Sequence, residues 1–167
     1  HRLLEVGVPV IVVTGAHVVE VETALDGLPV AIERHPGWAE GMGSSLAAGI
    51  RRVVADFPDA TGTLLCLADQ PLLDIELLQR MLARHRAAAE AILATTQGSN
   101  DGPPVLFPRD CFAALAKWSG AHGARALLKH EAQRVEHFST SSMVDVDTPA
   151  DLRRVHEALA THRSIRL

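Results

Sequence analysis

The stretch TGTLLCLADQPLLD, residues 61–74, decides the fold. Its apolar run at residues 63–67 lies between turn-forming residues and predicts a strand covered on both faces, as in a parallel sheet. Asp69 is the first charged residue after this run, and ligands of open α/β sheets bind beyond the carboxyl ends of the strands. A carboxylate at this place can hold a metal ion over a phosphate. The alternative is that Asp69 and Gln70 only form a turn before Pro71.

Strand-like and helix-like segments alternate along the rest of the chain. Apolar and β-branched runs predict further strands at residues 8–14, 30–33, 91–95, 105–107, 135–138 and 143–146. Helical spacing and caps predict helices at residues 17–25, from Ser44 or Ser45, from Asp74, at 109–118, at 123–130 and after Thr148. Residues 97–104 are predicted to form a polar surface loop. This alternation predicts one α/β layer sandwich in a single domain, residues 1–167.

Composition excludes several classes of protein. The net charge is −4 and the 16 Lys and Arg residues are scattered, which argues against a nucleic-acid partner, although one nucleotide needs only a few placed groups. No apolar run approaches the roughly 20 residues of a membrane span, so no membrane partner is expected. Cys66, predicted inside the strand at 63–67, and Cys111 make no disulfide framework, which favours a cytoplasmic protein.

A glycine-rich segment, GMGSS at residues 41–45, precedes an amphipathic helix. Ser44 or Ser45 is predicted to cap that helix, and Gly41 and Gly43 let the backbone before it approach a ligand. Backbone N–H groups at a helix start can bind a ligand oxygen. The alternative is an ordinary Ser-capped helix after a flexible turn.

The segment VDVDTPADLRRVHEAL, residues 144–159, predicts a capped helix. Thr148 is a good N-cap residue, and Asp151 three residues later completes a pattern like a capping box. The buried stripe of this helix is predicted to be Leu152, Val155 and Leu159.

Asp145 and Asp147 lie just before this cap, on alternate positions that point the same way in a strand. The alternative is that one of them only solvates the turn. If the ends of the neighbouring strands meet, these carboxylates converge with Asp69. Oxygen ligands without His or Cys suit Mg²⁺ or Mn²⁺, which normally bring phosphate with them, and such a site suits nucleotidyl transfer.

Five segments together resemble one family. They resemble motifs of the MobA-like nucleotidyltransferases, and in particular of the molybdenum cofactor cytidylyltransferases, and they occur here in the same order. The segments are WAEGMGSSLAAGI, LCLADQPLL, GPPVLFPRDCFAAL, GARALL and DVDTPADL. The resemblance extends from about residue 10 to residue 159. It implies a three-layer, Rossmann-like fold of the GT-A type with a mostly parallel sheet.

The resemblance also implies an activity. The enzyme would transfer CMP from CTP to molybdopterin with Mg²⁺ (or Mn²⁺), release pyrophosphate, and hand its product to a recipient molybdoenzyme or its chaperone. Asp69 matches the catalytic, metal-binding carboxylate, and Asp147 with Asp145 beside it matches the second metal contact. The residues that match nucleotide-binding positions are Gly41, Met42, Gly43, Ser44, Ser45, Asp69, Gln70 and Pro71, of which Gln70 and Pro71 resemble the variant associated with cytidine.

Two departures from the family pattern stand out. The N-terminal glycine-rich signature of the type LAAGxSxRMGxxK, and the central strand that leads into it, are absent, so the domain is predicted to be N-terminally incomplete and weakly active in isolation. Ala121 and His122 stand where many relatives carry an acidic and a basic residue. The alternatives are a guanylyltransferase, a sugar-phosphate nucleotidyltransferase, or a non-catalytic accessory protein for the molybdenum cofactor.

Overall fold

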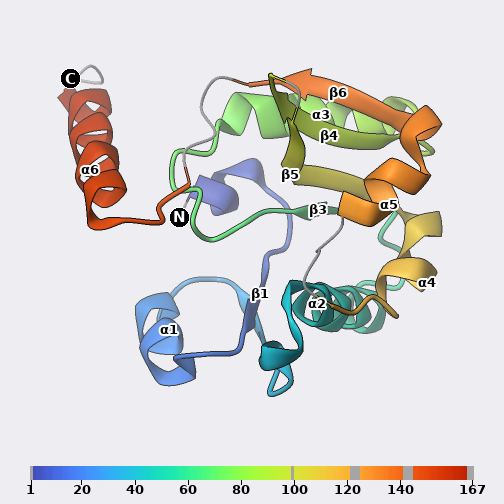
Figure 1. Ribbon diagram of the computed structural model, residues 1–167, viewed down its shortest axis with the longest axis horizontal. Helices are drawn as coiled ribbons and strands as arrows, with labels where there is room; N and C mark the ends of the chain where they lie inside the picture. The colour runs from blue at the N-terminus through green and yellow to red at the C-terminus, as the bar shows by residue number, and fades with distance from the viewer. Residues whose placement is uncertain (1, 99, 121–124, 141–144, 165–167) are drawn as a thin grey trace.

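The computed structural model describes residues 2–98, 100–120, 125–140 and 145–164 (Figure 1). The strands are β1 (Ile11–Thr14), β2 (Ala31–Arg34), β3 (Gly62–Leu65), β4 (Ile92–Gln97), β5 (Asn100–Pro108) and β6 (Val135–Ser139). The α-helices are α1 (Val18–Leu25), α2 (Met42–Asp56), α3 (Ile75–Ala87), α4 (Phe112–Leu115), α5 (Arg125–His130) and α6 (Pro149–Ser164). The 3-10 helices are η1 (Arg2–Val6), η2 (Trp38–Glu40), η3 (Arg109–Cys111) and η4 (Ala132–Arg134).

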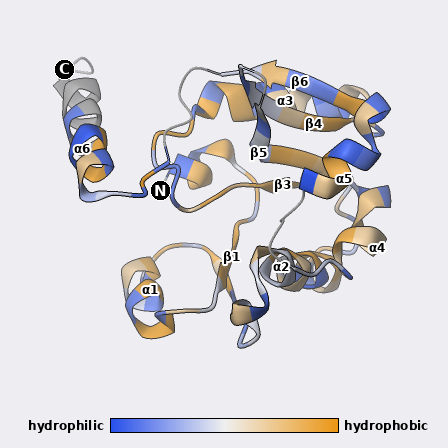
Figure 2. Cartoon of the chain, in the orientation of Figure 1, coloured by the Kyte–Doolittle hydropathy of each residue, from blue (hydrophilic) through white to orange (hydrophobic). Residues whose placement is uncertain are grey.

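Helices cover both faces of the larger sheet, which gives the three layers that were predicted. Ile92 and Ala94 of β4 pack with buried residues of α2, α4 and α5, whereas Leu93 between them packs with α3. This alternation follows from the period of two in a strand. Figure 2 shows that hydrophobic residues dominate β4 and β5, the strands at the centre of this core.

The described strands form two sheets. The larger sheet has the strand order β3-β5-β4-β6. In it, β4 and β6 are parallel, and β5 is antiparallel to both of its neighbours, β3 and β4. The smaller sheet consists of β1 and β2, which are parallel. The larger sheet is therefore mixed, because β5 follows β4 through a tight turn at Gly98 (φ +65°) and not through a crossover helix. Among the described strands, β1 and β3 each have one neighbour.

The prediction of a polar loop at residues 97–104 was wrong. Most of this segment belongs to β5, which lies between β3 and β4. The register with β4 passes from Val105 opposite Ala94 to Gly102 opposite Thr95, so that the two prolines at 103 and 104 fall in a bulge. A bulge is a place where a strand tolerates proline without losing a ladder hydrogen bond. Thr95 Oγ1 donates to the Gly102 carbonyl at 2.8 Å and closes this irregular step.

Strand β3 is shorter and less covered than predicted. It ends at Leu65, so Cys66 lies beyond the strand and not inside it. All four of its residues are partly exposed, because β5 is its neighbour on one side and no other described strand pairs with it. Burial still raises the pKa of the Cys66 thiol to about 12, which keeps it protonated and unreactive.

The start of α2 differs from the prediction. The helix begins at Met42 and its N-cap is Gly41, whose φ of 112° is readily adopted by glycine. Ser44 is therefore already helical, and its hydroxyl donates to the Gly41 carbonyl at 2.8 Å. The prediction of a Ser44 or Ser45 cap was wrong. The Asp74 cap is confirmed, because its carboxylate accepts hydrogen bonds from the backbone N–H groups at the start of α3.

The cap of α6 is confirmed, but its predicted stripe is only partly buried. Thr148 N–H and Oγ1 donate to Asp151 Oδ2 at 2.9 and 2.6 Å, and Asp151 N–H donates back to Thr148 Oγ1 at 3.2 Å. Val155 is buried, whereas Leu152 is 46% exposed, and the side chain of Leu159 lies outside the described part. Leu152 is exposed because α6 projects from the body of the domain (Figure 1).

Three other predicted segments differ from the prediction or reach residues outside the described part. The predicted helix at 109–118 is observed as η3 followed by α4, and the predicted helix at 123–130 is observed from Arg125. Of the predicted strand at 143–146, Asp145 and Val146 are not in a strand, and the other two residues lie outside the described part. No helix in the described ranges has the length and apolar character to cross a membrane.

Candidate functional site

The loop after β3 meets the segment before α6, although about 75 residues separate them in the chain (Figure 1). The Val146 N–H donates to the Asp69 carbonyl at 2.9 Å. The Gln70 side-chain amide donates to Asp145 Oδ1, also at 2.9 Å. One backbone bond and one side-chain bond therefore hold the two segments together, and Asp69, Asp145 and Asp147 gather at this junction.

We call Asp69, Asp145 and Asp147 the carboxylate corner. All three residues are exposed, so a ligand can reach them from solvent. The pKa of the Asp69 carboxyl is raised. The main cause is that neighbouring groups remove part of its hydration, and the nearby negative charges of Asp145 and Asp147 add to the effect. The corner is thus a concentration of like charge, which a cation would stabilise.

The donors of this corner fit a hard divalent cation. Its charged donors are carboxylate oxygens without His or Cys, the set that Mg²⁺ and Mn²⁺ prefer. Within the described residues, no three His, Cys, Asp or Glu side chains are already arranged closely enough to hold a metal ion. Gln70 beside them is 5% exposed, and its Oε1 has no hydrogen-bond partner in the described structure. A ligand at the corner that carries a hydrogen-bond donor would satisfy this buried acceptor.

The glycine-rich segment makes contacts that sequence reasoning did not foresee. The Gly43 N–H donates to the Gly120 carbonyl at 2.9 Å. A Cβ at Gly43 would lie 2.8 Å from the Ser119 carbonyl carbon, so residue 43 must be glycine for this loop to pack on α2. The sequence indicated that a backbone approaches here, and the approaching group is the chain itself.

Ser44 and Met42 differ in their availability to a ligand. Ser44 is buried, and its Oγ lies 2.9 Å from His35 Nε2. Met42 is 55% exposed, and nearby Trp38 is 47% exposed with its Cβ directly against Gly15. The aromatic residue in HPGWAEG was the only signal in the sequence for this exposed surface.

The structure does not join the glycine-rich segment to the carboxylate corner. Helix α2 packs on β1 and η2, and its start at Gly43 lies against Ser119 and Gly120, while Asp69 belongs to the loop that leaves the larger sheet. Figure 1 shows these two places well apart. The Ser45 side chain is half-buried and so is Pro71. In the described part of the chain, the predicted nucleotide-binding residues therefore form two groups.

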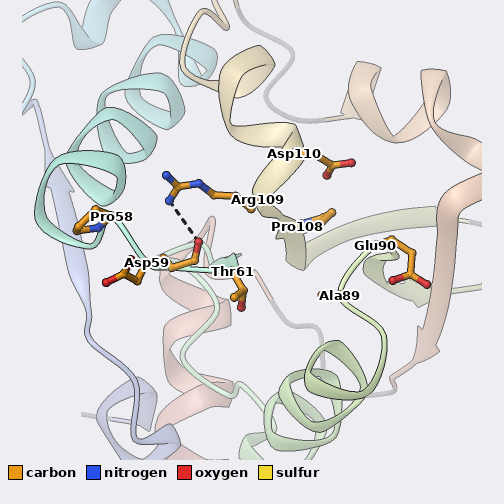
Figure 3. Close-up of a pocket in the computed structure, with 9 residues that line it drawn as sticks. Pro58, Asp59, Thr61, Ala89, Glu90, Pro108, Arg109 and Asp110 are labelled. Carbon is orange, nitrogen blue, oxygen red and sulfur yellow. Dashed lines mark hydrogen bonds between the residues drawn. The ribbon is translucent and has the colours of Figure 1, made fainter.

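A separate pocket of about 500 Å³ lies at the other end of β3, before the strand begins (Figure 3). Its walls come from the loop before β3, the turn between α3 and β4, and the junction of β5 with η3. Arg109 turns to the Ala60 carbonyl, to which its Nη1 donates at 3.3 Å. None of the predicted site residues lines this pocket. It therefore adds nothing to the carboxylate corner.

Comparison with known proteins shows the family. Residues 1–137 match the MobA-like NTP transferase domain, and the chain belongs to that family. It is 30% identical to the purine catabolism protein PucB of Bacillus subtilis over 72% of this chain, but it spans only 58% of the length of PucB. It is also 30% identical to nicotine blue oxidoreductase of Paenarthrobacter nicotinovorans, over 87% of this chain and 74% of that protein.

Solved structures show the same fold. Rv0371c of Mycobacterium tuberculosis in complex with manganese is 26% identical and superposes with a TM-score of 0.69, over 93% of this chain and 84% of that one. A nucleotidyl transferase from Methanothermobacter superposes with a TM-score of 0.80 at 22% identity, over 96% and 78% of the two chains. The chain thus has the Rossmann-like, GT-A-type nucleotidyltransferase fold that the resemblance implied.

Proposed function

We propose that this domain transfers CMP from CTP to molybdopterin and releases pyrophosphate. The observation that carries the proposal is the carboxylate corner, where Gln70 and the backbone of Val146 hold two distant segments together. The family supports nucleotidyl transfer as the class of reaction. The order of the sequence motifs supports molybdopterin as acceptor, and the resemblance of the motif set to the cytidylyltransferases supports cytidine as the base. The product would pass to a molybdoenzyme or its chaperone.

The corner would hold Mg²⁺ or Mn²⁺. Asp69 is the proposed catalytic ligand, and Asp147 with Asp145 would supply the second contact. The bound ion would neutralise the triphosphate and the charge that develops as pyrophosphate leaves. The manganese complex of Rv0371c supports a divalent ion in this fold. The same proposal places the reaction in the cytoplasm, in keeping with the free thiols of Cys66 and Cys111.

We propose further that a strand and a glycine-rich loop outside this sequence complete the site. β1 and β3 belong to separate sheets in the described structure, and each has only one described neighbour. A strand that pairs with both would join the sheets and would bring its following loop between the start of α2 and the corner. Parallel strands place their following loops at one edge, where phosphates bind. The experiments below therefore use the full-length protein that carries this chain.

The test supplies the full-length protein with molybdopterin, CTP and Mg²⁺ and measures pyrophosphate together with the mass of the pterin product. We expect pyrophosphate and a cytosine dinucleotide to form in equal amounts, and less product with GTP. An Asp69→Asn variant should lose this activity, whereas Asp26→Asn, at an exposed position after α1, should retain it. A folded Asp69→Asn variant with unchanged turnover would remove the catalytic assignment.

A second candidate function comes from the relative named as an oxidoreductase, which is 30% identical over 87% of this chain. Under that alternative the nucleotide-binding fold would hold a reduced dinucleotide cofactor in place of a triphosphate. The same preparations therefore also receive NADPH or NADH with a dye acceptor. Dye reduction without pyrophosphate release from any nucleoside triphosphate would favour the alternative.

A further inference from the structure

Gln70 is the buried polar residue at the carboxylate corner. It is 5% exposed, although the neighbouring Asp69 is exposed. Its Nε2 donates to Asp145 Oδ1 at 2.9 Å, across about 75 residues of chain. This contact between side chains of the corner uses one N–H of the amide, and the Oε1 that could accept from a base amino group is itself buried.

The hydrogen-bonding capacity of the amide fixes its orientation. If the amide were reversed, Oε1 would face a carboxylate oxygen, and two acceptors would meet. Nε2 therefore faces Asp145, and Oε1 is left buried with no partner among the described residues. A buried acceptor of this kind is costly unless a donor arrives. Water bound to a metal ion is such a donor.

We propose that Gln70 is a positioning residue for the metal ligand Asp145, and that it does not read the nucleotide base. Its amide fixes one oxygen of Asp145 and leaves the other for the cation. The amide is neutral, so it orients the carboxylate without cancelling the negative charge that attracts the ion. This inference rests on the proposed metal site, and the test below separates the two.

Hydrogen bonds to ligating side chains typically change metal affinity by about 10–100-fold when they are removed. Gln70→Met keeps the length of the side chain and removes the donor, so the affinity for Mn²⁺ should fall by that factor. The ratio of CTP to GTP use should not change, because Asp145 does not contact the base. A glutamine that reads the base would give the opposite pair of results.

The test titrates the full-length protein with Mn²⁺ alone and follows free ion by electron paramagnetic resonance. Gln70→Met and Gln70→Asn, whose amide is one methylene too short to reach Asp145, should both bind more weakly than wild type. Gln79→Met, at an exposed position on α3, is the matched control and should bind like wild type. Circular dichroism selects the folded variants, and Gln70→Asn serves if Gln70→Met does not fold.

A double variant identifies the route of the effect. In an Asp145→Asn background, Gln70→Met should cause no further loss, because the residue acts through Asp145. Wild-type protein that binds no Mn²⁺ would overturn the metal site and the proposed function with it. The positioning role alone would be overturned if Gln70→Met and Gln70→Asn bind Mn²⁺ as tightly as wild type. It would also be overturned if the losses of affinity add in the double variant.

Discussion

Gly43→Ala should destabilise the domain, because a Cβ at this position has no space. The new atom would lie 2.8 Å from the Ser119 carbonyl carbon, 2.8 Å from Trp118 Cδ1 and 2.9 Å from the Gly120 carbonyl oxygen. Two of these three atoms are backbone, so a side-chain rotation cannot relieve the overlap. The loop must move away from α2, and the bond from Gly43 N–H to the Gly120 carbonyl is strained or lost with it.

The expected loss can be estimated from three contributions. Overpacking costs about 1–3 kcal/mol. Loss of one hydrogen bond costs about 0.5–1.5 kcal/mol. The higher helix propensity of alanine raises the free energy of unfolding by about 1 kcal/mol and offsets part of this loss. The free energy of unfolding should therefore fall by about 0.5–3.5 kcal/mol. Each kcal/mol corresponds to a drop of about 2–4 °C in melting temperature for a chain of this size.

Urea denaturation followed by circular dichroism measures this loss, and Gly49→Ala is the matched control in the same helix. A Cβ at Gly49 would meet only the end of the Val13 side chain, at 3.0 Å, which can give way. Gly49→Ala should therefore stay within about 1 kcal/mol of wild type, since the helix-propensity gain offsets the contact. Gly43→Ala with wild-type stability but weaker nucleotide binding would refute the reasoning, because residue 43 would then be small for a ligand.

Three further outcomes test the caps and one buried histidine. Asp74→Ala should lower the free energy of unfolding by about 1 kcal/mol because two N–H groups of α3 lose their acceptor, and Asp74→Ser should recover most of it in the same urea assay. Thr148→Ala should cost a similar amount, about 1 kcal/mol, seen as earlier loss of helical signal on heating. Burial lowers the pKa of His85 below its ordinary 6.5, so the unfolded chain binds a proton that the native state does not. Stability should then fall as the pH drops below 6.5, and His85→Gln, which can still bond to Thr61, should flatten that part of the profile.

Local signals in the sequence were enough for the caps of α3 and α6 and for the α/β class of the fold. Asp74 and Thr148 bond to groups within three residues, so their function does not depend on the rest of the fold. The alternation of strands and helices likewise predicted an α/β layer sandwich, whereas the packing of α3 on one face of the sheet and of α2 on the other is known from the structure. The predicted cap at Ser44 failed because Gly41 reaches a conformation that starts the helix earlier, which side-chain types do not reveal.

Pairing between distant segments could not be predicted from the sequence. Residues 97–104 have the composition of a loop, yet tertiary pairing makes most of them a central strand and moves the prolines at 103 and 104 into a bulge. Gly43 indicated a close approach, but only the structure identifies Gly120 as the approaching group. The gathering of Asp69 with Asp145 was expected from the strand ends, whereas the bond from Gln70 that holds Asp145 was not.

The most direct test of the central claim follows the phosphates of CTP. Full-length protein receives Mg²⁺, molybdopterin and CTP labelled either at the α- or at the γ-phosphate. We expect the α-label in the pterin product and the γ-label in pyrophosphate, with both lost in Asp69→Asn and retained in Asp26→Asn. An α-label that never reaches the pterin, or a folded Asp69→Asn variant that transfers it at the wild-type rate, would contradict the assignment of nucleotidyl transfer to the carboxylate corner.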